Sequence, residues 1–158
     1  MKKVAIGSEI SSFGLKEAVK KHLLSLGYEV EDVGTLSEDA PVAYYDVAVS
    51  VAQAVQSGVY ERGIVICGTG GGVSLIVNKF KGIYCVACES IYTAERTSLV
   101  NNCNVLAMGG NVVSHAMGCE MAEKWMAGNW CEGFDEERRA RNVNGFEVLT
   151  RWENENFK

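Results

Sequence analysis

A cysteine directly ahead of a glycine-rich turn is the strongest chemical signal in this 158-residue chain. Cys67 ends the apolar run 63–67, and four of the next five residues, 68–72, are glycines. Glycines let backbone N–H groups point inward at an anion, and a helix that starts there adds positive potential. The same potential favours the thiolate form of Cys67. The pattern predicts a site in which a thiolate and oriented N–H donors face a bound, negatively charged group.

The same residues also fit a tight strand-to-helix turn with an inert, buried cysteine, and the local pattern leaves both interpretations open. A Walker A loop is excluded, because no Gly-Lys-Ser/Thr follows the glycines.

The elements that must position this turn follow from the hydrophobic pattern, which alternates short β-branched runs with helical spacings. We expect strands over 4–6, 28–33, 63–67, 83–88 and 105–108, and helices over 15–26, 46–57, 71–79, 91–100 and 117–126. Five strands alternating with helices predict one doubly wound α/β domain with a five-stranded parallel sheet. Ligands bind such sheets beyond the carboxyl ends of the strands, which is where the glycine-rich turn lies.

The last part of the chain differs from the rest. Residues 1–131 read as one α/β domain, and residues 132–158 as a charged tail that packs on the same or a neighbouring subunit. The tail carries Arg138, Arg139 and Arg141. These arginines could bind an anion, or form a solvated basic turn balanced by the acidic residues 135–137.

Composition limits the class of protein. Hydrophobic residues make up 47% and charged residues 22%, which excludes a mainly disordered chain. A net charge of −5 argues against a nucleic-acid partner, which needs a basic stripe. No apolar run reaches the roughly 18 residues of a membrane span, and no signal peptide follows Met1, so we expect a cytoplasmic protein with no membrane partner.

The six cysteines fit reduced, mostly buried thiols in such a protein. Cys85-x-x-Cys88 has a metal or redox spacing, but it lies inside an expected strand and lacks a second Cys or His pair at zinc-site spacing. We therefore predict no metal.

Four segments, in order and spacing, carry a resemblance to a known family. Residues 4–8 (VAIGS), 67–74 (CGTGGGVS), 78–83 (NKFKGI) and 104–109 (NVLAMG) resemble the ribose-5-phosphate isomerase B / galactose-6-phosphate isomerase family. The similarity covers roughly residues 3–143. It implies a Rossmann-like three-layer αβα fold, homodimers or homotetramers, and aldose–ketose isomerisation of a sugar phosphate with no cofactor.

The resemblance also implies roles for site residues. Isomerisation of this kind removes a proton next to a carbonyl and passes through an enediolate, so it needs a base and fixed donors for the oxyanion. Cys67 matches the family's base, and Thr69 and Asn101 match residues that stabilise the enediolate. Tyr44 matches a tyrosine that lines the pocket. The substrate would also meet the N–H groups of the turn, from residues Gly68, Gly70, Gly71 and Gly72.

Two departures from the family pattern concern the sugar. After residues 7–8 the family usually has Asp-His, whereas this chain has Glu9 and Ile10. The acid is kept with one extra methylene, and the phosphate-contacting histidine is lost. Immediately before the family's asparagine stands a ring-opening histidine, and here that residue is Val100. Either another group opens the ring, or the substrate arrives open, as a tetrose 4-phosphate would.

Further departures concern the substrate's anionic end. Asn111 stands where the family often has an arginine after the fifth strand. Arg138 aligns with a phosphate-binding arginine, but the second such position is Asn142, with Arg139 and Arg141 close by. The residues implied for the enediolate are therefore retained, whereas several of those implied for the substrate's anionic end are replaced.

Three functions remain open from the sequence. The first is an isomerase of a small sugar phosphate. The second keeps this chemistry on a non-phosphorylated sugar or a sugar acid. The third is a non-catalytic partner subunit of a hetero-oligomeric isomerase, against which the joint presence of Cys67, Thr69 and Asn101 argues.

Overall fold

The structure, a computed structural model, describes residues 3–157 and contains one five-stranded parallel sheet. The strands run in the order β2-β1-β3-β5-β4, and the chain changes direction across the sheet between β1 and β3. Their bounds are β1 (Lys3–Ser8), β2 (Glu29–Asp32), β3 (Arg62–Cys67), β4 (Cys85–Ala87) and β5 (Val105–Gly109). The predicted α/β class and five-stranded parallel sheet are confirmed.

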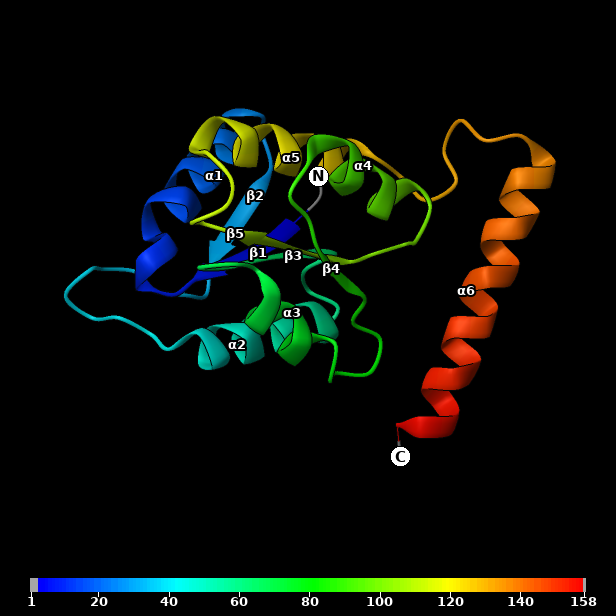
Figure 1. Cartoon of the computed structure of the whole chain (residues 1–158), viewed down its shortest axis with the longest axis horizontal. Helices are drawn as coiled ribbons and strands as arrows, with labels where there is room; N and C mark the ends of the chain where they lie inside the picture. Colours follow the sequence, from blue (N-terminus) through cyan, green and yellow to red (C-terminus); the bar gives the residue numbers. More distant parts are fainter. Residues whose placement is uncertain (1–2, 158) are drawn as a thin grey trace.

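Helices cover both faces of the sheet, which makes the three-layer αβα domain that the sequence predicts (Figure 1). One layer holds α1 (Phe13–Ser25), which follows the short 3-10 helix η1 (Ile10–Ser12), together with α4 (Ile91–Leu99) and α5 (His115–Ala127). The other holds α2 (Tyr44–Gln56) and α3 (Gly71–Val77). The central strands β1, β3 and β5 are buried almost throughout, because both their faces pack against helices.

Each helix layer buries an apolar stripe against the sheet. On α1, Leu15, Val19 and Leu23 are at most 1% exposed and pack with Trp125 of α5 against one face of the sheet. On α2, the stripe that begins at Val47 packs against the other face, together with residues of α3. These two cores hold the carboxyl ends of β1 and β3 in fixed positions.

The tail ends in one long helix, α6 (Glu136–Asn156), which buries none of its side chains and stands away from the αβα body (Figure 1). Its C-terminal half is attached by Glu153, whose carboxylate accepts a hydrogen bond from the Gly82 N–H (2.7 Å) and another from the Tyr84 hydroxyl (2.8 Å). The ring of Phe146 lies 5.1 Å, centroid to centroid, from both Tyr84 and Trp130. The charged helical tail is thus confirmed as a helix with a small contact area on its own domain.

All six cysteines are free; Cys119 is half-buried and the other five are buried, as expected for reduced thiols. Over residues 3–157, no helix is long and apolar enough to cross a bilayer. Within the same range, no three His, Cys, Asp or Glu side chains gather as a metal site would require.

Candidate functional site

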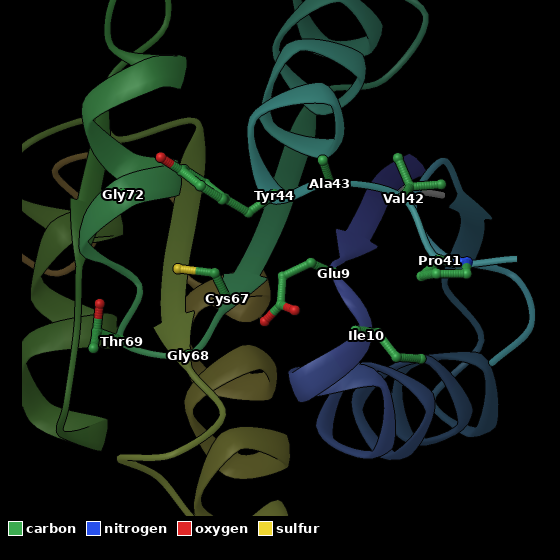
Figure 2. A pocket seen from close by; sticks show the side chains of 10 residues that line it. All are labelled: Glu9, Ile10, Pro41, Val42, Ala43, Tyr44, Cys67, Gly68, Thr69 and Gly72. Atoms are coloured by element: carbon green, nitrogen blue, oxygen red, sulfur yellow. The ribbon is translucent and has the colours of Figure 1, made fainter.

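A cavity of about 630 Å³ opens at the carboxyl ends of β1 and β3, where the chain changes direction across the sheet. This is the place at which ligands bind in open parallel sheets. Figure 2 shows its lining side chains, which come from the ends of both strands and from the first turn of α2. The lining residues are Glu9, Ile10, Pro41, Val42, Ala43, Tyr44, Cys67, Gly68, Thr69 and Gly72.

The glycine-rich turn takes its shape from a close approach between two backbones. Gly70 is the N-cap of α3 and has a left-handed φ of 78°. A Cβ at this position would lie 2.9 Å from the carbonyl carbon of Met108 on β5, so only glycine fits. The turn is tied down further by the Gly110 N–H, which donates to the Cys67 carbonyl oxygen at 2.9 Å.

Cys67 is the last residue of β3, and its side chain lines the cavity while being only 7% exposed. Its Sγ accepts a hydrogen bond from the Gly70 N–H at 3.2 Å. This contact holds the sulfur against the turn, next to the start of α3. The reactivity of Cys67 stays a prediction of the sequence.

Glu9 lies in the same cavity, directly after β1 (Figure 2). It is the N-cap of η1: one carboxylate oxygen accepts from the Ser11 N–H at 2.8 Å, and the other accepts from the Ser11 hydroxyl and, at 3.4 Å, from the Ser12 hydroxyl. These bonds fix the carboxylate, which leaves it placed to accept hydroxyl groups of a bound ligand.

Tyr44 and Thr69 lie on the same side of Figure 2 as Cys67 and Gly72. A Cβ on Gly72 would lie 3.0 Å from the Tyr44 ring, so this glycine leaves room for the tyrosine that begins α2. The Thr69 hydroxyl accepts from the Gly71 N–H at 3.3 Å, and its proton is free to point at a ligand. Both residues therefore join Cys67, as the resemblance implies.

The remaining turn residues and Asn111 lie beside the cavity. Asn111 Nδ2 is 3.1 Å from the position that a Cβ on Gly68 would take, and the Asn111 N–H donates to the Gly68 carbonyl oxygen at 3.0 Å. Gly70 and Gly71 shape the turn and begin α3 without lining the cavity.

Four predicted site residues do not meet Cys67 within one chain. Asn101 and Arg141 line a second cavity of about 560 Å³ between α6 and the β4–α4 region, together with Val100. Arg138 is exposed, with its guanidinium carbon 4.0 Å from the centroid of the Phe134 ring. Arg139 is exposed in the first turn of α6.

The main cavity has an apolar wall that no motif in the sequence predicts, formed by Ile10, Pro41, Val42 and Ala43. In the sequence, Ile10 stands out only by the histidine that it replaces. The other three belong to the loop between β2 and α2, which carries no chemical motif. The one available signal was Pro41, the only proline in the sequence.

The groups around the main cavity are of the kinds that proton transfer at carbon uses. They are a thiol, backbone N–H donors and two hydroxyl groups around one space, and abstraction of a proton next to a carbonyl uses a base and such donors. Its ionisable lining residues are Glu9, Tyr44 and Cys67, and none of the lining residues is cationic. A ligand with a strongly anionic end therefore needs a cation from outside this lining.

Comparisons with known proteins agree with this geometry. The sequence pattern of the family described as ribose/galactose isomerase matches residues 4–145. The chain is similar to a 4-deoxy-4-sulfo-D-erythrose isomerase of Clostridium sp. (strain MSTE9), with 46% identity over 87% of this chain and 86% of the relative. It is also similar to D-erythrulose-4-phosphate isomerase 2 of Mycolicibacterium smegmatis (38% identity; 78% and 83% covered).

Among solved structures, the fold is similar to ribose-5-phosphate isomerase B of Clostridium thermocellum. The TM-score is 0.81 at 35% sequence identity, and the match covers 95% of this chain and 99% of that one.

The cysteines should differ in reactivity. Burial raises the pKa of Cys88 to about 11 and that of Cys103 to about 12, and it raises the pKa of Cys85 well above its ordinary value. These thiols stay protonated at neutral pH, whereas Cys67 lines an open cavity and accepts an N–H. We expect iodoacetamide at pH 7.5 to alkylate Cys67 before these three, as read by peptide mass spectrometry, with Cys67→Ser as the control. Earlier labelling of Cys85 or Cys103 in the folded protein would contradict this.

Proposed function

Because this chain belongs to the ribose/galactose isomerase family and is an aldose–ketose isomerase, we propose that it acts on a four-carbon sugar. In this proposal the substrate is open-chain and carries an anionic group on its last carbon. The leading candidate for that group is a sulfonate, and the second is a phosphate.

The observation that carries the proposal is Val100. In the family that the chain resembles, this position holds a histidine that opens the sugar ring. Valine cannot transfer a proton between a ring oxygen and an anomeric hydroxyl. Val100 lies beside Asn101 in the second cavity, and it is half-buried with its carbonyl oxygen accepting from the Trp130 indole N–H at 3.3 Å. A substrate that never closes its ring does not need the lost group.

Four-carbon sugars with a substituted fourth carbon have this property. A furanose forms when the hydroxyl on the fourth carbon attacks the aldehyde, and that hydroxyl is absent from a 4-deoxy-4-sulfo sugar and esterified in a 4-phosphate. Two of the similar proteins bear names of such four-carbon substrates. Their names and the valine support the same substrate length.

The charge of the substrate's anionic end separates the two candidates. A phosphate monoester carries about −1.5 to −2 at pH 7, whereas a sulfonate carries a single charge. This chain has Ile10 and Asn111 where the resemblance implies a histidine and an arginine, and the main cavity has an apolar wall with no cation in its lining. Fewer cations suit the ion of lower charge, which supports the sulfonate. The similarity to D-erythrulose-4-phosphate isomerase 2 supports the phosphate.

We assign the proton transfer to Cys67. As thiolate, held by the Gly70 N–H, it takes the proton from the second carbon of the aldose, and the electron pair moves to the carbonyl oxygen to form an enediolate. The N–H groups of the turn, together with the Thr69 hydroxyl, stabilise that oxyanion. The thiol then returns the proton to the first carbon, and the hydroxyl proton passes between the two oxygens, which leaves the ketose. Glu9 is placed to bind the substrate's hydroxyl groups.

If Cys67 is the base, Cys67→Ala should lower kcat by about a thousandfold or more, since no other group in the cavity is aimed to take the same proton. The fold should survive because the residue lies at the end of a strand. Turnover and circular dichroism measure the two effects. Cys119→Ala, on the half-buried thiol of α5, is the matched control and should keep full activity. Appreciable turnover by Cys67→Ala would make Glu9 the first alternative base.

We also propose that the working site is shared between two copies of the chain. The main cavity lacks a cation, while Asn101 and Arg141 line a cavity that Cys67 does not reach. The 21-residue helix α6 has no buried side chain and exposes Val148, Leu149 and Trp152 at 37%, 41% and 56%. A helix of this kind draws its stability from packing an apolar face, so a second subunit is the natural cover. The partner's α6 would then bring arginines to the substrate's anionic end.

Subunit mixing tests the shared site. Cys67→Ala and Arg141→Ala should each be inactive alone, yet mixed dimers should regain activity, because one of their two sites contains both native residues. Random exchange makes half of the dimers mixed with one intact site each, so we expect about a quarter of the unaltered activity. Arg138→Ala can replace Arg141→Ala in the same experiment. No recovery, with exchange verified by mass, would place both residues in one subunit's site.

A substrate panel tests the proposed length. We expect kcat/KM for the four-carbon 4-sulfo and 4-phospho aldoses to exceed that for ribose 5-phosphate at least about tenfold, because the protein lacks a ring-opening acid–base group. Val100→His should raise kcat/KM for ribose 5-phosphate about tenfold and change the four-carbon values by less than about threefold. Val100→Leu is the matched control, which adds bulk without a titratable group. Equal efficiency of the unaltered enzyme on four and five carbons would contradict the proposal.

A further inference from the structure

The apolar wall of the main cavity depends on a buried hydroxyl that lies outside the cavity. We propose that Thr35 is a positioning residue for the substrate: its hydroxyl holds the backbone of Val42, and thereby the part of the cavity lining formed by residues 41–44, against the end of the sheet. This inference rests on the proposed function, since it names a residue that sets how that substrate binds.

Thr35 is itself fixed from two sides. It is completely buried, and its N–H donates to the carbonyl oxygen of Ser8 at the end of β1, at 3.0 Å. Its carbonyl oxygen accepts from the ammonium of Lys16 on α1 at 2.6 Å. Lys16 is also completely buried and donates to Asp32 at the end of β2, at 2.5 Å. A charged donor inside the protein is costly to unpair, so this anchor is rigid.

The Thr35 hydroxyl carries this rigidity to the cavity. Its Oγ1 accepts a hydrogen bond from the Val42 N–H at 3.0 Å, which closes the neck of the loop 35–42. Residues 36–41 beyond the neck are exposed, with Leu36 at 68%. The Thr35 hydroxyl therefore attaches Val42 to the anchored segment, while the residues between them face solvent.

The Thr35 hydroxyl affects binding in this proposal because Val42 and the two residues after it line the cavity. Ala43 is the N-cap of α2 and makes no side-chain capping hydrogen bond, so its side chain does not fix the start of this helix. Tyr44 is the first residue of α2, and all three residues line the main cavity. Cys67 reaches the same cavity from β3, which is held by the sheet. Loss of the Thr35 hydroxyl should thus displace the wall and leave the base in place.

Three variants separate this role from a general effect on stability. Thr35→Val keeps the shape of the side chain and removes the acceptor, whereas Thr35→Ser keeps the acceptor. Ser37→Ala is the matched control, because the Ser37 hydroxyl also accepts a backbone N–H, that of Asp39 at 3.3 Å, but at the exposed tip of the same loop. Each is assayed with the four-carbon 4-sulfo and 4-phospho aldoses, and hydrogen–deuterium exchange is followed at the Val42 amide.

We expect Thr35→Val to raise KM at least about fivefold and to change kcat less than about twofold, with both constants restored in Thr35→Ser and unaltered in Ser37→Ala. The Val42 amide should exchange at least about tenfold faster in Thr35→Val than in the serine variant. The proposal would be overturned if KM were unchanged in Thr35→Val, or if the Val42 amide exchanged equally fast in Thr35→Val and Thr35→Ser. If Thr35→Val does not fold, the unaltered protein decides. Protection of its Val42 amide from exchange supports the proposal, and lack of protection overturns it.

The exchange readout does not depend on turnover. If no four-carbon substrate is isomerised by the unaltered protein, the proposed function fails, while the Val42 amide still decides whether Thr35 holds the wall.

Discussion

The site depends on one close backbone contact, between the turn after β3 and the end of β5. Gly70 lies so near the Met108 carbonyl that no side chain fits between them, and in this position its N–H points at the Cys67 sulfur at 3.2 Å. The same contact lets α3 begin directly after the turn. A wider turn would leave the thiol without its donor, so the hydrogen bond to Cys67 and the packing of two neighbouring strands have a common cause.

Charge is distributed unevenly between the two cavities. The cavity around Cys67 contains Glu9 and no cationic side chain, whereas Arg141 lines the cavity beneath α6, with Arg138 and Arg139 nearby on the same helix. In the proposed reaction the enediolate needs local donors, which the turn supplies, and the anionic substituent needs a cation, which one chain's cavity does not supply. This division is what the proposed shared site requires, in which the two ends of the substrate meet different subunits.

The two sides of the main cavity are held by different forces. The proposed base and oxyanion donors belong to β3 and its turn, which hydrogen bonds to β5 fix on the buried sheet. Three of the four residues of the apolar wall belong to a long loop, which the buried Lys16–Thr35 network attaches to β1. Reaction chemistry and substrate fit can therefore change independently, since a substitution in the loop network leaves the strand that carries Cys67 unaltered.

The sequence by itself determined the five strands, the helices between them and the presence of a turn after Cys67, because apolar periodicity and a run of glycines are local properties of the chain. Only the tertiary structure decided the strand order, the wall at residues 41–43 and the anchor formed by Lys16 and Thr35. It also decided that Asn101 lies in a different cavity from Cys67. These features arise where distant segments pack together, and an exposed loop or a buried lysine carries no local pattern that says which segment it will meet.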